Sequence, residues 1–249
     1  MANDSLSGFL TAALLARYVA QLPSRHWNYR FIFVPETIGA IAYLAHNEEK
    51  MQKVNAGLVI TTVGGPGKFG LKKSWNEQHW INDLIESSLS DKTGDFLVYP
   101  FDVRGSDERQ YSSPGFRINT ATVSKDKYHE YREYHSSLDN LDFVTSNQLM
   151  ETFGVYVDII NRMENLRFYR NTEPHGEPML SKHNLYPTLG GGKVPQVGDK
   201  SDLDLMLWLL FYCDGNTPLS QIAKNLSLEE SELSQPVQVL LDSGLLVKE

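Results

Sequence analysis

Over its first two-thirds the chain alternates between helical and strand patterns, and this alternation restricts the fold more than any other feature. A solidly apolar run, YRFIFV at residues 29–34, predicts a strand buried on both faces. Further strands are predicted at 57–63, 96–100 and 116–123, and helices at 5–21, 38–51, 75–89 and 147–165. The alternation is typical of an α/β fold, an α/β sandwich with a mixed, largely parallel sheet.

Two different segments follow this region. Residues 171–200 are dense in Pro and Gly and predict a connecting segment. Its scattered apolar residues indicate that part of it packs against something: Leu180, Leu185, Tyr186 and Leu189. Residues 201–249 show three helical patterns and a short terminal apolar run, as in a winged-helix domain. We therefore expect an α/β domain over 1–170, a connecting segment over 171–200 and a winged helix over 201–249.

Composition excludes several classes of protein. Of the 249 residues, 41% are hydrophobic and 22% charged, which is ordinary globular composition. No apolar run approaches the roughly 20 residues of a membrane span. Asp4 and Arg17 interrupt the apolar N-terminal stretch, so we expect no export signal. A single cysteine, Cys213, fits a reducing cytoplasm, and a net charge of -8 argues against a nucleic-acid partner.

The winged-helix segment is itself acidic. Residues 201–249 carry eight Asp and Glu against two Lys, a balance of -6. A phosphate backbone would be repelled, which disfavours a transcription regulator. We expect a packing module or a homo-oligomer contact instead.

Three short segments carry residue types suited to chemistry. Asp4 precedes a predicted helix and is either a helix cap or a metal ligand. Glu36 follows the apolar run and either compensates a helix dipole or acts as a general base. His135 precedes the last helix and is either structural or a ligand.

Together these segments resemble a known family. NDSLSG resembles the DNASG-type motif of zinc-dependent aminopeptidases, the co-catalytic exopeptidases of clan MH. FIFVPETIG, GSDERQYSSPGF and YHSSLDNLD resemble three further motifs of that family, in the same order. With GEPMLSKHNLYP and a winged helix added, the chain is similar to a bacterial branch often found near polysaccharide-biosynthesis genes. The resemblance implies a three-layer α/β/α sandwich.

The resemblance also implies roles for particular residues. Asp4 and His135 would bind zinc, one or two ions, and Glu36 would take a proton from metal-held water. Tyr134 would donate to the oxyanion of the tetrahedral intermediate. Three residues would lie beside the substrate: Asp107, Glu108 and Arg109. The substrate would be a peptide or an N-acylated small molecule.

Departures from the family pattern shorten the ligand set. Thr37 stands where the family has a second Glu, and Thr61 or Thr62 where it has an Asp. No His precedes Asp4, so the chain is expected to be N-terminally truncated. Two ligands hold zinc weakly, and the isolated chain is expected to bind it poorly or not at all. Six other histidines are weaker ligand candidates: His26, His46, His79, His129, His175 and His183.

Two motifs have plain interpretations. GGPGKFG at 64–70 lacks the ending of a phosphate-binding loop and predicts a mobile turn near the site. KYHEYREYH at 127–135 predicts an exposed loop or short helix. The leading hypothesis is therefore a zinc-dependent amide hydrolase of aminopeptidase type. The alternative is a catalytically degenerate binding or scaffold protein linked to surface polysaccharide biosynthesis.

Overall fold

The computed structural model describes residues 1–186 and 201–249, which divide into the compact units Met1–Glu164 and Asn165–Glu249. The first unit contains a four-stranded sheet of order β1-β4-β2-β3. Its strands are β1 (Ala56–Ile60), β2 (Gly70–Lys72), β3 (Leu97–Tyr99) and β4 (Asn119–Ser124). β1 runs parallel to β4 and β2 parallel to β3, while β2 and β4 are antiparallel. The sheet is thus mixed and largely parallel, as the sequence predicts.

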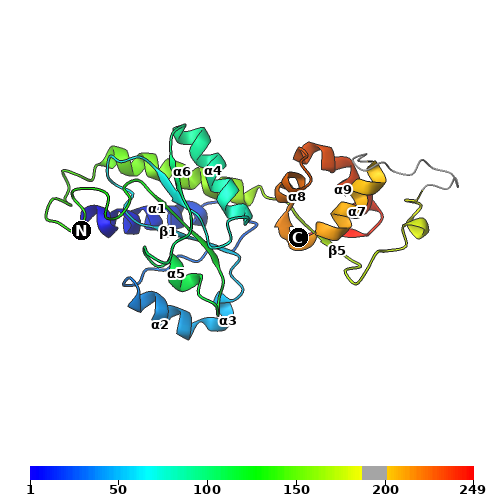
Figure 1. Cartoon of the computed structure of the whole chain (residues 1–249), viewed down its shortest axis with the longest axis horizontal. Coiled ribbons are helices and arrows are strands. Elements are labelled where there is room, and N and C mark those ends of the chain that lie inside the picture. The colour runs from blue at the N-terminus through cyan, green and yellow to red at the C-terminus, as the bar shows by residue number, and fades with distance from the viewer. Residues whose placement is uncertain (187–200) are drawn as a thin grey trace. The chain divides into compact units, whose positions relative to one another are not determined.

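Helices cover both faces of this sheet (Figure 1). One layer consists of α1 (Gly8–Ala20), α4 (Trp80–Thr93) and α6 (Ser146–Glu164), and the other of α2 (Ile38–His46), α3 (Glu48–Met51) and α5 (Glu108–Tyr111). α6 packs on α1 and α4 through an apolar stripe that includes Val155 and Ile159. The buried Tyr156 hydroxyl of α6 donates to the carbonyl oxygen of Val123 in β4 at 2.8 Å and so ties this helix to the sheet. The first unit is a three-layer α/β/α sandwich.

One predicted strand is absent. The run YRFIFV at 29–34 forms neither strand nor helix, and no backbone ladder joins it to a described strand. Its side chains are half-buried at best, and Phe33 is 45% exposed. The prediction of a strand buried on both faces was therefore wrong. An apolar run becomes a strand only where neighbouring strands supply its hydrogen bonds.

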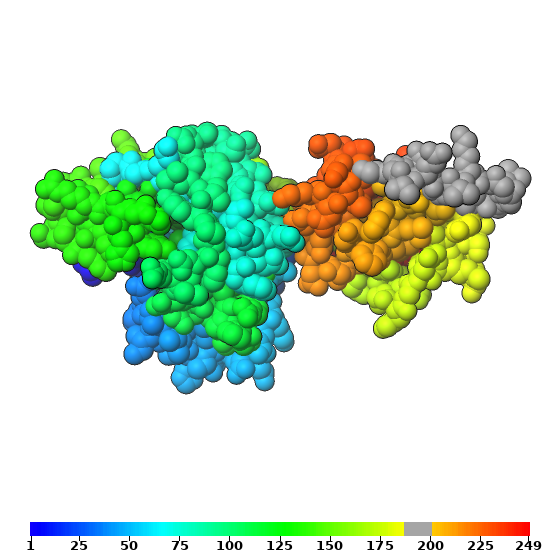
Figure 2. Space-filling view, viewed as in Figure 1, coloured from blue at the N-terminus to red at the C-terminus, as the bar shows by residue number. Residues whose placement is uncertain are grey.

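The glycine-rich turn after β1 also differs from expectation. Val63, Gly64 and Gly65 are buried, and the Gly64 amide donates to Asn3 Oδ1 at 2.7 Å. The Val63 amide donates to the Ser7 hydroxyl at 3.1 Å. In the space-filling view this cyan turn lies against the green surface that includes residues 125–145 (Figure 2). The first half of the turn is therefore tied down, which corrects the expectation of a mobile turn.

The second unit is a winged helix built on an antiparallel sheet of order β6-β5-β7. Its strands are β5 (Phe168–Asn171), β6 (Asp214–Pro218) and β7 (Leu246–Lys248). Its helices are α7 (Asp202–Tyr212), α8 (Leu219–Asn225) and α9 (Ser234–Asp242), with the 3₁₀ turns η2 (Leu180–His183) and η3 (Glu230–Leu233). β5 and Leu180 lie outside the 201–249 range expected for the winged helix and yet belong to its sheet and core.

The remaining expectations for the connecting segment divide in two. Leu180 is buried and Leu185 packs against the core of the second unit, while Leu189 lies outside the described residues.

Over the described part of the chain, no helix is both long and apolar enough to cross a bilayer.

Candidate active site

A cavity of about 570 Å³ opens in the first unit beside its sheet. Thr61 and Thr62 line it just beyond β1, Thr122 and Ser124 on β4, and Lys72 and Tyr99 on β2 and β3, where Lys72 pairs with Thr122 across the sheet. Loops that leave these strands complete the wall. Ligand sites of α/β proteins commonly lie at strand ends, where loops from several strands converge.

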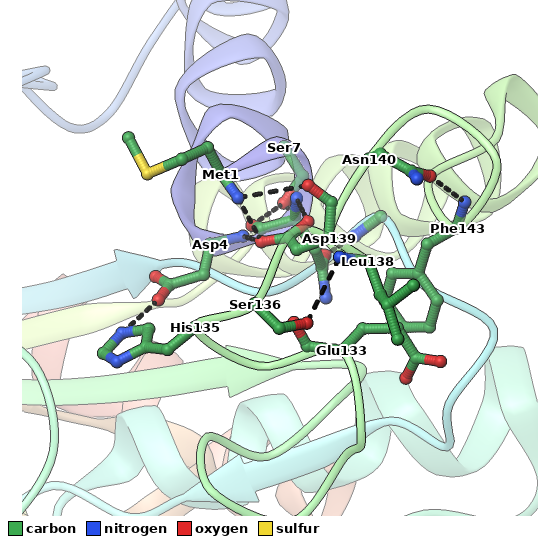
Figure 3. A network of polar contacts seen from close by, with 12 residues as sticks. Met1, Asp4, Ser7, Glu133, His135, Ser136, Leu138, Asp139, Asn140 and Phe143 are labelled. Atoms are coloured by element: carbon green, nitrogen blue, oxygen red, sulfur yellow. Dashed lines mark hydrogen bonds and ion pairs between the residues drawn. The ribbon is translucent and has the colours of Figure 1, made fainter.

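The cavity brings together three residues that the sequence analysis assigned to catalysis or metal binding. Asp4, Glu36 and Tyr134 all line it. His135 contacts this group from the side, with Nε2 2.9 Å from Asp4 Oδ2 (Figure 3). The Tyr134 ring stacks on the His135 ring at 3.9 Å between centroids. Residues separated by up to 131 positions therefore share one site.

Burial raises the pKa of two groups at this site, the Asp4 carboxyl and the Tyr134 hydroxyl. Burial raises the pKa of Asp4, and the negative charge of Glu36 raises it further, while the facing His135 lowers it. Burial likewise raises the pKa of the Tyr134 hydroxyl, helped by Asp4 and Glu36. Tyr134 accordingly keeps its proton at neutral pH and remains a hydrogen-bond donor.

Asp139 positions Asp4 (Figure 3). Its carboxylate accepts hydrogen bonds from the backbone amides of Asn3 at 2.5 Å and Asp4 at 3.0 Å. The terminal amine of Met1 adds an ion pair at 2.6 Å. These contacts fix the backbone at Asp4 to the loop that carries His135.

Backbone strain gathers around the same cavity. Thr37, Thr62, His129 and His135 have positive φ angles of 61°, 50°, 67° and 52°. For a β-branched residue such as Thr62 this conformation is a genuine outlier. Strained residues cluster at functional sites, where surrounding packing holds them in place.

The three residues expected beside the substrate have different environments. Asp107 Oδ1 accepts a hydrogen bond from the Thr37 amide at 2.7 Å and so anchors the loop that carries Glu36. Arg109 lines the cavity. Glu108 is 1% exposed, is not among the cavity-lining residues and forms an ion pair with Lys72.

Sequence reasoning missed several cavity residues. Lys72, Arg104, Lys127 and Tyr128 line the cavity and were not foreseen, and His129, named above only as a weaker ligand candidate, lines it too. Three of them belong to KYHEYREYH, for which an exposed loop or short helix was expected. The alternation of aromatic and charged residues in that run was the available signal, since such side chains line binding sites as readily as they cover a surface.

The donor set agrees only in part with a zinc site. Carboxylate and imidazole are zinc ligands, and Asp4 and His135 lie side by side. A catalytic zinc normally has three protein ligands, yet the described residues include no group of three or more suitable side chains. Thr61 and Thr62 line the cavity at the position where the aminopeptidase motifs that this sequence resembles have an acid. The residues present therefore do not complete a zinc site.

Comparison with known proteins places the first unit in a family. The profile of the family described as "Domain of unknown function (DUF4910)" matches residues 1–166. The chain belongs to this DUF4910 family. A winged helix-turn-helix family matches residues 167–248 of the DUF4910 chain.

Relatives of this DUF4910 chain carry informative names. A Clostridium acetobutylicum protein named as a polysaccharide biosynthesis protein with an aminopeptidase-like domain is 33% identical over 246 residues, 99% of this chain and 55% of the relative. A crystal structure from the same organism, named as a peptidase, matches with a TM-score of 0.69 and 31% identity, over 100% of this chain and 55% of the other. The chain thus spans about half the length of these relatives.

A more distant neighbour supports the fold alone. The crystal structure of Legionella pneumophila LapA matches 65% of this chain and 48% of its own at 12% identity, with a TM-score of 0.52.

Proposed function

We propose that the DUF4910 unit carries the active site of an amide hydrolase of aminopeptidase type, in a protein linked to polysaccharide biosynthesis. The observation that carries the proposal is the shared cavity of Asp4, Glu36 and Tyr134, with His135 in contact with Asp4. The names of the Clostridium acetobutylicum relatives support the same class of activity.

The residues of this chain divide the work of amide hydrolysis between them. Glu36 is an exposed carboxylate at the cavity wall and accepts the proton of the attacking water. It then returns this proton to the leaving amine. The Tyr134 hydroxyl, which stays protonated, donates a hydrogen bond to the carbonyl oxygen as negative charge develops there. Asp4 and His135 would supply two ligands to a zinc ion, one fewer than the three protein ligands of a usual catalytic zinc, and the ion would polarise the attacked carbonyl and the water.

Hydrolysis of an aminoacyl anilide with added zinc tests the proposal. We expect turnover in the wild-type chain that Glu36→Gln lowers by at least roughly 100-fold, the usual range for loss of a general base. Glu49→Gln, at an exposed position of α3, is the matched control and should keep full activity. Normal turnover by Glu36→Gln would remove Glu36 from its assigned role.

The second candidate function is ligand binding without hydrolysis. Thr61 and Thr62 in the cavity wall and the short ligand set favour it. The same assay separates the two candidates. Absence of turnover at every zinc concentration, together with retained binding of an uncleaved dipeptide amide, would establish the binding function.

A further inference from the structure

We propose that the ligand of this cavity carries an acidic group, a carboxylate or a phosphate, in addition to the amide that faces Glu36. This inference rests on the proposed function, because it uses the same cavity. It assigns a substrate class: amino-terminal compounds with an anionic substituent.

A fixed cation stands in the cavity wall. The Lys72 side chain is 6% exposed and still lines the cavity. Its ammonium donates to Glu108 and to the Arg104 carbonyl oxygen, and lies 5.6 Å from the Phe101 ring centroid. A buried ammonium is retained only where such partners hold it. These partners leave Lys72 rigid, at a set place beside the ligand.

The guanidinium of Arg104 is the group that binds the acidic part of the ligand. Arg104 is exposed, lines the cavity and is held next to Lys72 through its own carbonyl oxygen. Within residues 1–186 and 201–249 no hydrogen bond or ion pair engages its guanidinium. A guanidinium binds carboxylate and phosphate through two parallel hydrogen bonds, which gives affinity and orientation together.

Two of the three acids near this end of the cavity are paired with lysines. Glu108 pairs with Lys72, and Glu130 pairs with Lys127. Asp102 accepts a hydrogen bond from the Arg104 backbone amide at 3.0 Å. Arg109 adds a further positive charge, with its guanidinium also bound to the Val103 carbonyl oxygen at 3.2 Å. The positive charge of Arg104 acts on the Asp102 carboxylate through space, but within the described part of the chain no side chain occupies the hydrogen-bond donors of its guanidinium.

The cavity consequently has two kinds of charge. Asp4 and Glu36 suit a ligand's free amine, while the Arg104 guanidinium suits an anion; Lys72, paired with Glu108, fixes the position of Arg104 through the Arg104 carbonyl oxygen. A ligand with an amine and an acidic group satisfies both, whereas a neutral ligand leaves the guanidinium without a partner.

Calorimetric binding of isosteric dipeptide amides tests this. The probes are Ala-Glu-NH2 against Ala-Gln-NH2 for a carboxylate, and Ala-phosphoserine-NH2 against Ala-Ser-NH2 for a phosphate. At low salt we expect at least one acidic peptide to bind roughly ten-fold more tightly than its neutral isostere, and this preference to shrink as salt is raised. Which acidic peptide shows the preference identifies the group.

Two variants complete the experiment. Arg104→Gln should remove most of the preference, and Arg17→Gln, at an exposed position of α1, should retain it. Equal affinities of acidic and neutral peptides, or an unchanged preference in Arg104→Gln, would overturn the proposal. Because binding is measured without added zinc, a failure of hydrolysis counts only against the proposed function.

Discussion

Asp139 shows how a single residue sets the position of a site. Burial alone would raise the pKa of its carboxyl, but the hydrogen bonds from the Asn3 amide, the Met1 amine and the Asp4 amide outweigh burial and lower the pKa. A carboxyl with a lowered pKa in the folded state stabilises the fold above its ordinary pKa. The stabilisation is lost as the pH falls through the lowered value.

Replacing Asp139 by Asn should therefore cost stability in a pH-dependent way. We expect Asp139→Asn to lower the free energy of unfolding by about 2 kcal/mol at pH 7, since charge-assisted hydrogen bonds to two amides are weakened. The difference from wild type should shrink towards pH 2–3. Urea denaturation at both pH values measures this, with the exposed Asp142→Asn as control. A constant difference at all pH values would contradict the assignment.

Site residues could be predicted from the sequence only where they belong to a short recognisable motif. Asp4, Glu36, Tyr134 and His135 lie in motifs, and the structure brings all four together. Lys72 and Arg104 lie in no motif, and only the packing of β2 against the 102–107 loop brings them together. The sequence alone gives no indication that Lys72 and Arg104 are in contact.

At the scale of elements, α4 begins at an unusual cap. His79 Nδ1 accepts a hydrogen bond from the Ile81 amide at 3.3 Å. Burial lowers the pKa of His79 from about 6.5 to about 4, so the fold holds the neutral imidazole. Stability from this group is complete above pH 6.5 and is lost as the pH falls towards 4.

His79→Asn should remove that pH dependence, because Asn caps a helix without titrating. Between pH 7 and pH 4 we expect the wild type to lose on the order of 2 kcal/mol more of its unfolding free energy than the variant. Denaturation midpoints across this range measure it, with the exposed His46→Asn as control. Parallel pH profiles of wild type and His79→Asn would contradict the account.

Two glycines in helices should respond in opposite ways to alanine. A Cβ at Gly8, the first residue of α1, would lie 2.0 Å from the Ile60 carbonyl oxygen, whereas a Cβ at Gly154 in α6 meets nothing within 4 Å. We expect Gly8→Ala to destabilise the fold by roughly 2 kcal/mol or more. Gly154→Ala should stabilise it by about 0.5–1 kcal/mol. Thermal denaturation distinguishes the two, and an unchanged midpoint in Gly8→Ala would show that α1 does not approach β1 this closely.

Helices and strands with a periodic pattern in their own residues could be predicted from the sequence. Strands that depend on hydrogen bonds to residues far along the chain could not. The apolar stripe of α6 is periodic in the chain. The run at 29–34 has strand composition but no ladder partner among the described strands, and residues of β5 pair with residues 44 to 79 positions away. Hydrogen bonding between remote segments decides such elements.

At the scale of the whole molecule, the class of the fold followed from the order of its elements, and the extent of each unit did not. Each described unit has its own buried core. β5 and Leu180 join the second core although they lie before the helical pattern by which that unit was recognised. A strand of four residues carries too little sequence signal to reveal its unit.

Asp4 and His135, 131 positions apart, are in contact, and we propose that they hold a metal ion only weakly because the ligand set of the described residues is incomplete. Calorimetric titration of the chain with zinc tests it most directly, using wild type, Asp4→Asn and His135→Gln. Complete zinc sites release about 10–16 kcal/mol on binding, so we predict affinity in the micromolar range or weaker for the wild type and its loss in both variants. Tight stoichiometric binding by the wild type, or weak binding that neither variant alters, would contradict the account.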